Sequence, residues 1–440
     1  MGRAAIAPLV RSTPARGHPY WSGAMPRETL IMKRLRSLTF LTFLGVLVVI
    51  VSAVTIDASP AARLVNRIPT DITVALQNDA GVIVRAGAVA NDGTMWWVGG
   101  LYTTVDGLPQ PGLWRSTDGE RWERITAAPV TGYGEVSDLY SIAASPEGVV
   151  AIGMATGGAH GNPRTVSWKL GADDILHEVR ADFELYNGPR QIGVRTVARA
   201  SDRWVIVGSR VNRNGLLGAT SWTSVTGDDF AIHDDDRALS GEPGQQRQGL
   251  DVVRFGAELI AVGEQLTTRP GFIDTDAIAW SSLDGTVWAP WVGALTQGLS
   301  LGGAGDQRGQ RVAVRGERLM IAGTQTVRDT TSFVAWTRVA NRWRKTRITA
   351  LGVSDDPGSN VTAALVADDG FYVAVRSGDA LRLAYSADGR RWTSIPLPGA
   401  PRGTRGRVGL ASNGTSIIVA ARSETGGAVW TLPLRGDALR

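Results

Sequence analysis

Arginine is the residue type whose positions in this sequence could create a chemical site. Four arginines lie in loops that lead into the first strand of successive repeated segments: Arg190, Arg247, Arg308 and Arg405. If the repeats superpose around one axis, their guanidinium groups converge on one rim, where they would bind a carboxylate, phosphate or sulfate group. The alternative interpretation is that each arginine pairs with a nearby acid or points into solvent.

Histidine, acidic and cysteine residues predict neither a metal site nor a cofactor. His233 is followed directly by residues 234–236, all aspartate, and four adjacent residues in one loop are typical of a solvated acidic turn rather than a metal cage. His160 and His177 have no partner at metal-ligand spacing. The sequence has no cysteine, which excludes disulfides, thiolate zinc sites and a cysteine nucleophile.

The charge distribution argues against a nucleic-acid partner. Residues 1–37 contain seven basic side chains and one acidic one, a net charge of +6, while the whole chain of 440 residues carries +5. Everything after residue 37 therefore sums to about −1. A near-neutral body lacks the basic surface that a nucleic-acid binder requires.

One uncharged segment is long enough to cross a membrane. Residues 38–56 read LTFLTFLGVLVVIVSAVTI, close to the roughly 20 apolar residues that a transmembrane helix needs. Lys33, Arg34 and Arg36 precede the segment and Asp57 follows it, so the positive-inside rule places the N-terminus in the cytoplasm and the rest of the chain outside. We expect a tail or mis-called start at 1–31, a signal anchor at 32–57 and a linker at 58–70.

A cleaved signal peptide is the alternative to a retained anchor. Val51, Ser52 and Ala53 have the small-residue form of a cleavage site, and the order of basic and apolar residues is the same in both cases. Either interpretation makes the remaining chain extracytoplasmic, as a single-pass membrane protein or a secreted one.

The chain from residue 71 to 436 is a sevenfold repeat. A second-strand glycine recurs at Gly99, Gly153, Gly208, Gly263 and Gly323, with Val375 and Ala420 in the last two units. An aromatic anchor follows in each unit at Trp114, Trp168, Trp222, Trp280, Trp336, Tyr385 and Trp430. The spacing of these markers along the sequence, together with the absence of a helical period, predicts an all-β protein. We expect a seven-bladed β-propeller of four-stranded blades.

Three units contain the same tight turn after the anchor. The shared residues are Ser116, Asp118, Gly119 and Trp122; Ser282, Asp284, Gly285 and Trp288; and Ser386, Asp388, Gly389 and Trp392. Asp-Gly between two strands predicts a hairpin, because glycine accepts a positive φ and the carboxylate accepts turn amides. We expect the aromatic residue that ends the motif to pack on the neighbouring blade.

The last unit supplies only three strands, so its outer strand is missing. The strand-like residues 71–76 precede the first unit and have no other partner. We therefore predict that they pair with the strand around Trp430 and close the ring, since a propeller must avoid open sheet edges.

These Ser-x-Asp-Gly-x-x-Trp turns resemble the Asp boxes, or bacterial neuraminidase repeats, of sialidase-like and sortilin-like propellers. The turns are one residue shorter here, and the motif is structural in that superfamily. Sialidases also share an early Phe/Tyr-Arg-Ile-Pro motif whose arginine holds the substrate carboxylate, which the resemblance assigns to Arg67 in Asn66-Arg67-Ile68-Pro69. Asn66 replaces the aromatic residue, sialidases have six blades, and a linker that happens to spell Arg-Ile-Pro is the alternative.

The sequence thus predicts a membrane-tethered binding or scaffold propeller for an extracytoplasmic protein, glycan or anionic ligand. No complete catalytic constellation accompanies the complete structural pattern, and fold alone does not establish function. The alternative is a sialidase-like glycoside hydrolase, which would place a tyrosine–glutamate pair close to converging arginines. An assembly scaffold for a membrane complex is a third hypothesis.

Overall fold

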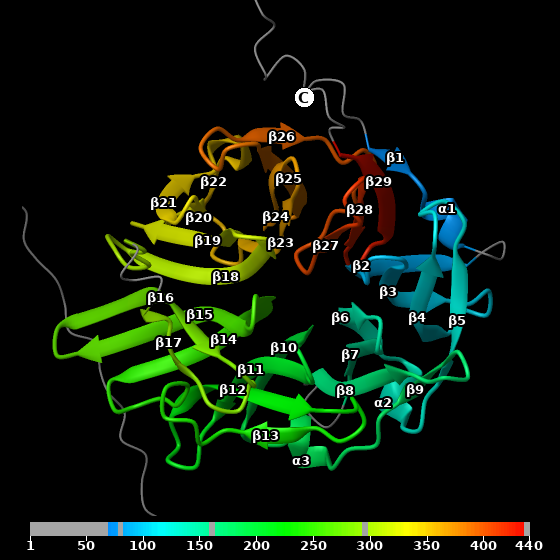
Figure 1. The fold of residues 1–440 in the computed structure, drawn as a ribbon, viewed down its shortest axis with the longest axis horizontal. Helices are drawn as coiled ribbons and strands as arrows, with labels where there is room; N and C mark the ends of the chain where they lie inside the picture. The colour runs from blue at the N-terminus through cyan, green and yellow to red at the C-terminus, as the bar shows by residue number, and fades with distance from the viewer. Residues whose placement is uncertain (1–68, 78–81, 158–162, 293–297, 435–440) are drawn as a thin grey trace, which may run out of the picture. The chain divides into compact units, whose positions relative to one another are not determined.

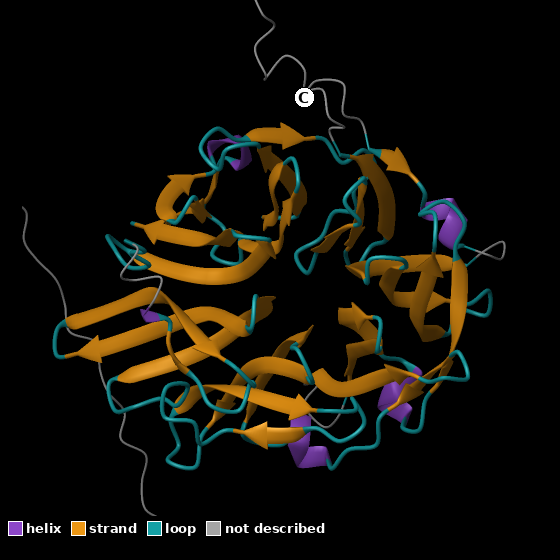
Figure 2. Cartoon of the chain, in the orientation of Figure 1, coloured by secondary structure: helices purple, strands orange, loops and turns teal. Residues whose placement is uncertain are grey.

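The computed structural model describes residues 69–77, 82–157, 163–292 and 298–434. These residues belong to one compact unit, Asp57–Arg440. Strands dominate them, and the helices are single turns (Figure 2). Within these ranges no helix has the length and apolar character needed to span a membrane. The expected tail (1–31), signal anchor (32–57) and Arg67 lie outside the described residues.

Most strands form antiparallel meanders of four. The first contains β2 (Ile83–Asn91), β3 (Trp96–Thr103), β4 (Pro109–Ser116) and β5 (Glu123–Ala128). The second contains β6 (Asp138–Ser145), β7 (Gly148–Thr156), β8 (Pro163–Leu170) and β9 (Ile175–Glu178). The third contains β10 (Gln191–Arg199), β11 (Trp204–Val211), β12 (Leu217–Ser224) and β13 (Ala231–His233). The fourth contains β14 (Gln245–Phe255), β15 (Glu258–Arg269), β16 (Phe272–Ser282) and β17 (Ala289–Pro290).

The remaining strands continue the pattern with two variations. The next sheet contains β18 (Asp306–Arg315), β19 (Arg318–Val327), β20 (Thr330–Val339) and β21 (Arg342–Arg347), with β22 (Val353–Ser354) also paired to β20. It is followed by β23 (Asn360–Ala367), β24 (Gly370–Ser377), β25 (Ala380–Ser386) and β26 (Thr393–Ile395). The last contains β27 (Arg407–Ser412), β28 (Ser416–Arg422), β29 (Gly427–Pro433) and β1 (Thr70–Asp71). The helical turns are α1 (Thr73–Leu76), α2 (Gly132–Glu135), α3 (Phe183–Tyr186) and η1 (Thr349–Leu351).

The sheets surround a common centre, which makes this unit a β-propeller. Figure 1 shows the first strand of each meander nearest the centre and the last strand outermost. A parallel pairing between β5 and β9 joins the first two meanders into one eight-stranded sheet. That seam could not be predicted from the sequence, because parallel pairing of two outer strands depends on how the sheets dock rather than on local pattern.

The N-terminal strand closes the ring as predicted, although it is shorter than expected. β1 pairs antiparallel with β29, Asp71 lying opposite Trp430. The prediction of a strand throughout 71–76 was wrong, because α1 begins at Thr73. The Asp71 carboxylate accepts the Thr73 amide at 2.8 Å, a local bond that ends the strand. The turn of helix then buries Leu76 completely.

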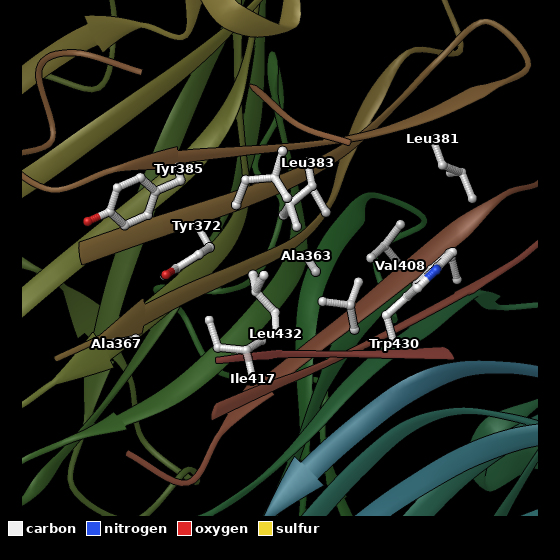
Figure 3. Close-up of a cluster of buried hydrophobic side chains, with 14 of the residues drawn as sticks. Ala363, Ala367, Tyr372, Leu381, Leu383, Tyr385, Val408, Ile417, Trp430 and Leu432 are labelled. Carbon is white, nitrogen blue, oxygen red and sulfur yellow. The ribbon is translucent and has the colours of Figure 1, made fainter. Parts of the chain in front are cut away.

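Apolar cores lie between neighbouring sheets. Figure 3 shows one of them, in which Tyr372 and Leu383 from β24 and β25 face Ile417, Trp430 and Leu432 from β28 and β29. The other clusters combine adjacent sheets in the same way. Each sheet is therefore held by burial against both neighbours, so that closing the ring completes the core.

The Ser-x-Asp-Gly segments are tight turns, as predicted. Ser116 Oγ accepts the Gly119 amide at 2.8 Å, and Asp118 accepts the next two amides at 2.9 and 2.8 Å. Gly119 has φ +77°, which a residue with a side chain rarely adopts. The closing aromatic residue packs on the preceding sheet: Trp288 is 4% exposed, and its Nε1 donates to the Ser221 hydroxyl of β12 at 3.1 Å.

Five of the repeated tryptophan anchors donate to a backbone carbonyl in the segment that leads into their own sheet. Trp114 Nε1 donates to the Leu76 carbonyl at 3.0 Å, and Trp336 Nε1 donates to the Ser300 carbonyl at 2.9 Å. Both indoles are almost fully buried. One residue therefore fills the core and satisfies a backbone carbonyl at the entry to the innermost strand, which explains why tryptophan recurs there.

We expect Trp114→Phe to lower the free energy of unfolding by about 2 kcal/mol, because the Leu76 carbonyl loses its donor and the smaller ring leaves space. Urea denaturation of the variant measures the change. Trp343→Phe is the matched control, since the half-buried Trp343 Nε1 has no hydrogen-bond partner among the described residues. Equal losses in the two variants would show that the bond to Leu76 contributes nothing.

Candidate functional site

The innermost strands carry β-bulges at a repeated position. In β2, β6, β10, β14, β18 and β23 the pairing skips a residue beside the second-strand marker position. The skipped residues are Gly87, Tyr140, Arg195, Leu250, Gln310 and Thr362. A bulge leaves its extra residue out of the ladder and redirects its side chain, and bulges recur beside functional sites.

Five of these bulge residues line one central cavity of about 330 Å³. The full lining consists of Tyr140, Val194, Arg195, Gln248, Leu250, Glu264, Arg308, Gln310, Arg311, Asn360, Val361, Thr362 and Arg407. The sheets from β6 to β27 thus each contribute side chains to the same space. Four of the lining residues are arginines and one is a carboxylate, so the cavity has an excess of positive charge.

Two of the four arginines are occupied by neighbours. Arg308 Nε lies 3.1 Å from Glu264 Oε2, and Gln248 donates to the other oxygen of that carboxylate at 2.9 Å. Arg311 donates to the backbone carbonyls of Thr362 and Gln310, both at 2.7 Å. The carbonyl contacts orient the Arg311 guanidinium, and the buried Asp251 is the acid whose charge acts on it.

The other two arginines have acids in their surroundings but form no direct ion pair within the described part of the chain. Neither Arg195 nor Arg407 forms an ion pair with any residue in the described ranges, and Arg195 Nε is buried without a hydrogen-bond partner there. The Arg407 guanidinium lies 5.0 Å from the centroid of the Tyr140 ring. Burial lowers the pKa of Arg195, and the positive charge of Arg407 adds to the shift against the opposing effects of Tyr140 and Glu264. The pKa of Arg311 is lowered chiefly by burial, and Arg407 and Arg195 add to the shift against the opposing effect of Asp251.

A bound anion would relieve this mutual repulsion of guanidinium groups. Guanidinium pairs are suited to carboxylate and phosphate, whose oxygens accept two parallel hydrogen bonds. The cavity volume suits a group the size of a monosaccharide acid or smaller. The arrangement can therefore bind and orient a small anionic group.

The other titratable groups in the cavity are not arranged for proton transfer. The Tyr140 hydroxyl donates to the Val194 carbonyl at 2.8 Å, and burial raises the pKa of Tyr140 to about 12. Burial also raises the pKa of Glu264, while Arg308 opposes that shift. A tyrosine nucleophile is activated by an adjacent base or by a lowered pKa, and the carbonyl partner and the burial of Tyr140 provide neither.

The predicted anion rim contributes one residue to this cavity. Arg308 lines it, whereas Arg190 pairs with the buried Asp234 at 3.0 Å. Arg247 donates to the carbonyls of Ser240 and Ala238 at 2.9 and 3.1 Å, and Arg405 is exposed. The structure therefore does not bring those four arginines together, and any ligand-binding role for Arg67, outside the described residues, stays a prediction.

Three cavity arginines were not predicted from the sequence. Each lies within five residues after a predicted arginine. Arg195, Arg311 and Arg407 stand five, three and two residues after Arg190, Arg308 and Arg405. Two of them complete a Gly-x-Arg sequence, Gly193-Val194-Arg195 and Gly309-Gln310-Arg311. Glycine beside a bulged strand position was the available signal, because bulges favour glycine there.

Two other sequence features have structural roles. The Asp236 carboxylate accepts the amides of Ala238 and Leu239 at 2.9 and 3.1 Å, which makes the acidic segment after His233 a turn. Residues 298–302 spell Gly-x-Ser-x-Gly, but they form the loop into β18 rather than a strand–turn–helix, the context that a nucleophile elbow requires. No group of three potential metal ligands occurs in the described ranges.

Comparisons with known proteins find structural similarity only. No protein-family model and no curated protein matches the sequence. The β-propeller domain of the Trilobed protease from Pyrococcus furiosus aligns with a TM-score of 0.46 at 11% identity, over 80% of this chain and 95% of that one. Pyrococcus horikoshii acylaminoacyl peptidase aligns with a TM-score of 0.45 at 10% identity, over 83% of this chain and 54% of the peptidase, about half its length.

Proposed function

We propose that this chain is an extracytoplasmic seven-bladed propeller that binds a small anionic group in its central cavity. The observation that carries the proposal is the pair of cavity arginines, Arg195 and Arg407, that form no ion pair with a residue in the described ranges. The blade count follows from treating β2–β5 and β6–β9 as separate blades joined at the β5–β9 seam, since each is a complete antiparallel meander. The anion is a carboxylate or phosphate carried by a protein or a glycan.

The cellular setting is part of the same proposal. The uncharged segment 38–56 with its preceding basic cluster tethers the propeller outside the membrane, or is removed as a signal peptide. A tethered module with one anion site suits a receptor for an extracytoplasmic ligand or a scaffold for a membrane complex. Nucleic acid is excluded as a partner by the near-neutral charge of the body.

One observation favours a second candidate, a sialidase-like glycoside hydrolase. Tyr140, Glu264 and four arginines line the same cavity. These are the residue types that such an enzyme needs. Against it, the Tyr140 hydroxyl is bonded to a backbone carbonyl and Glu264 is paired with Arg308. Binding without turnover therefore accounts for the geometry better than hydrolysis does.

If the central cavity binds an anion, the anion should stabilise the folded chain against thermal unfolding. Titrating the full-length protein with phosphate, glucuronate and N-acetylneuraminate should raise the thermal midpoint with at least one of them, because a ligand that binds only the folded state stabilises it by mass action. The double variant Arg195→Gln/Arg407→Gln should weaken that binding at least tenfold, about 1.4 kcal/mol or more. In the absence of ligand the variant should be no less stable, since it removes like-charge repulsion.

The exposed Arg405→Gln is the matched control for loss of a charge outside the cavity. If none of the anions protects the wild-type chain, or if the double variant responds as the wild type does, the anion site is wrong. Fluorogenic glycosides, sialosides included, test the second candidate in parallel. Turnover that disappears in Tyr140→Phe would establish the hydrolase and displace the non-catalytic proposal.

A further inference from the structure

The sheet that contains β18–β22 has β21 as an outer strand. β21 pairs with β20 along one edge, leaves its other edge open among the described residues and is rich in basic residues. β21 reads RWRKTR, and its residues Arg342, Arg344, Lys345 and Arg347 are exposed. It has six residues, whereas the outer strands β13, β17 and β26 have three, two and three. β5 is equally long but is covered by β9. Figure 1 shows β21 on the outer side of its sheet.

The turn before β21 determines which backbone groups face outward. Ala340 and Asn341 have φ +49° and +59° and form a two-residue hairpin turn, so Val339 and Arg342 exchange hydrogen bonds. Bonded pairs alternate along an antiparallel ladder, which makes Thr337–Arg344 and Ala335–Thr346 the next two.

The amides and carbonyls of Trp343, Lys345 and Arg347 consequently point away from the sheet. None of them bonds to a backbone group in the described ranges. Such a row of unpaired groups is a template for one more strand.

Arginine side chains lie beside this open edge. Arg342 and Arg344 from β21 and Arg390 from the turn before β26 line a cavity of about 850 Å³ between the two sheets. These three arginines form no ion pair with a residue in the described ranges. Three acids line the same cavity and are already engaged. Asp368 pairs with Arg315 at 2.8 Å, Asp369 accepts the Tyr372 hydroxyl at 2.9 Å, and Asp388 accepts the amides of Arg390 and Arg391 at 2.8 and 3.0 Å.

We propose that the β21 edge binds an acidic peptide segment as an added β-strand. Its backbone would pair with Trp343, Lys345 and Arg347, and its alternate carboxylates would pair with Arg342 and Arg344. The positive charge of β21 opposes pairing with a second copy of itself, which selects an acidic partner. This surface is separate from the central cavity and does not depend on the anion proposed there.

Lys345→Pro distinguishes strand addition from charge attraction. Proline removes the outward amide of residue 345 while leaving the bonds between β20 and β21 intact, since proline is tolerated on edge strands. Binding of a fluorescein-labelled, terminally blocked peptide of alternating glutamate and threonine to the full-length chain is measured by anisotropy at low salt. Lys345→Ala is the control for loss of the lysine side chain, and a lysine–threonine peptide is the control for charge.

We expect the acidic peptide to bind, the lysine peptide not to bind, and Lys345→Pro to weaken binding at least tenfold relative to Lys345→Ala. Arg342→Ser/Arg344→Ser should weaken it to a similar extent. If Lys345→Pro fails to fold, an acidic peptide with N-methylated backbone amides tests the same bonds on the wild-type chain and should not bind. The proposal is overturned if the acidic peptide does not bind. Binding that survives both Lys345→Pro and backbone methylation also overturns it, and identifies a general polyanion site instead.

Discussion

Replacing Gly323 by alanine is expected to destabilise the folded chain by about 3 kcal/mol. Gly323 is the fifth of the repeated second-strand glycines, and it lies opposite Gly309, beside the bulge of β18. A Cβ atom at residue 323 would stand 1.8 Å from the carbonyl oxygen of Arg308. That oxygen belongs to the backbone, so neither strand can yield without disturbing the bulge and the cavity residue Arg311 beside it.

Urea denaturation of Gly323→Ala measures the loss. Gly132→Ala is the matched control, because no heavy atom outside the local chain lies within 4 Å of a Cβ there and its φ is not positive. The control should change the free energy of unfolding by less than about 0.5 kcal/mol. If both variants unfold at the same urea concentration, the close approach at Gly323 does not matter for stability.

The same close approach occurs at two more of the repeated glycines. Gly263 would place a Cβ 1.8 Å from the Gln248 carbonyl, and Gly208 would place one 2.2 Å from the Gly193 carbonyl. At Gly99 and Gly153 a Cβ would instead meet the side chains of Ile142 and Ser137. In the last sheet Ala420 lies opposite Gly409, so the glycine is on the other strand. The repeated glycine therefore reflects a backbone contact in three sheets and side-chain packing in the first two meanders.

Some parts of the fold arise from residues that are close in sequence or that repeat periodically, and these parts could be predicted from the sequence. Alternating strands, aromatic anchors and Asp-Gly turns each leave a pattern within a few residues, and the closing pairing with Trp430 followed from a missing strand. The helical turn at Thr73 and the β5–β9 seam could not be predicted, because burial of Leu76 and docking of two sheets create them.

The sequence was sufficient to predict a positively charged site but not the residues that form it. Arginines at the entry to the innermost strands indicated a central positive cluster, and Arg308 does line the cavity. A bulge shifts the phase of a strand by one residue, however, so residue spacing alone could not show that Arg195 and Arg311 lie in the cavity while Arg190 pairs elsewhere. Tertiary geometry decides which of these arginines reach the centre: Arg195 but not Arg190, Arg407 but not Arg405, and both Arg308 and Arg311.

Arg422 and Asp138 form a buried ion pair beside that centre. Arg422 comes from β28 and Asp138 from β6, and their side chains are 12% and 15% exposed. The Arg422 side chain passes over Gly87, where a Cβ would lie 2.9 Å from its Cγ. The pair therefore connects the last meander to the second across the innermost strand of the first, and a glycine in β2 leaves the room for it.

Arg422→Met is expected to lower the free energy of unfolding by about 3 kcal/mol at neutral pH, because it leaves the Asp138 carboxylate buried beside only the more distant Arg407 and Arg85. Burial already raises the pKa of Asp138 above the ordinary value of 3.8, against the opposing charge of Arg422. When folding raises the pKa of a carboxyl group, the folded chain loses stability as the pH rises through that raised pKa. The variant should therefore regain part of its stability as the pH falls from about 7 toward about 4.

Urea denaturation at several pH values tests both the size and the direction of this effect. Arg315→Met is the matched control, since it breaks an ion pair with Asp368 whose partners are 46% and 55% exposed and should cost less than about 1 kcal/mol. Asp138→Leu combined with Arg422→Met should recover most of the loss, because a buried pair replaced by apolar side chains leaves no uncompensated charge. A single variant as stable as its control, or a double variant no better than Arg422→Met, would mean that the uncompensated carboxylate is not the cause. Recovery in the double variant would show that this pair stabilises the ring by neutralising Asp138 and that burial of apolar surface can replace it.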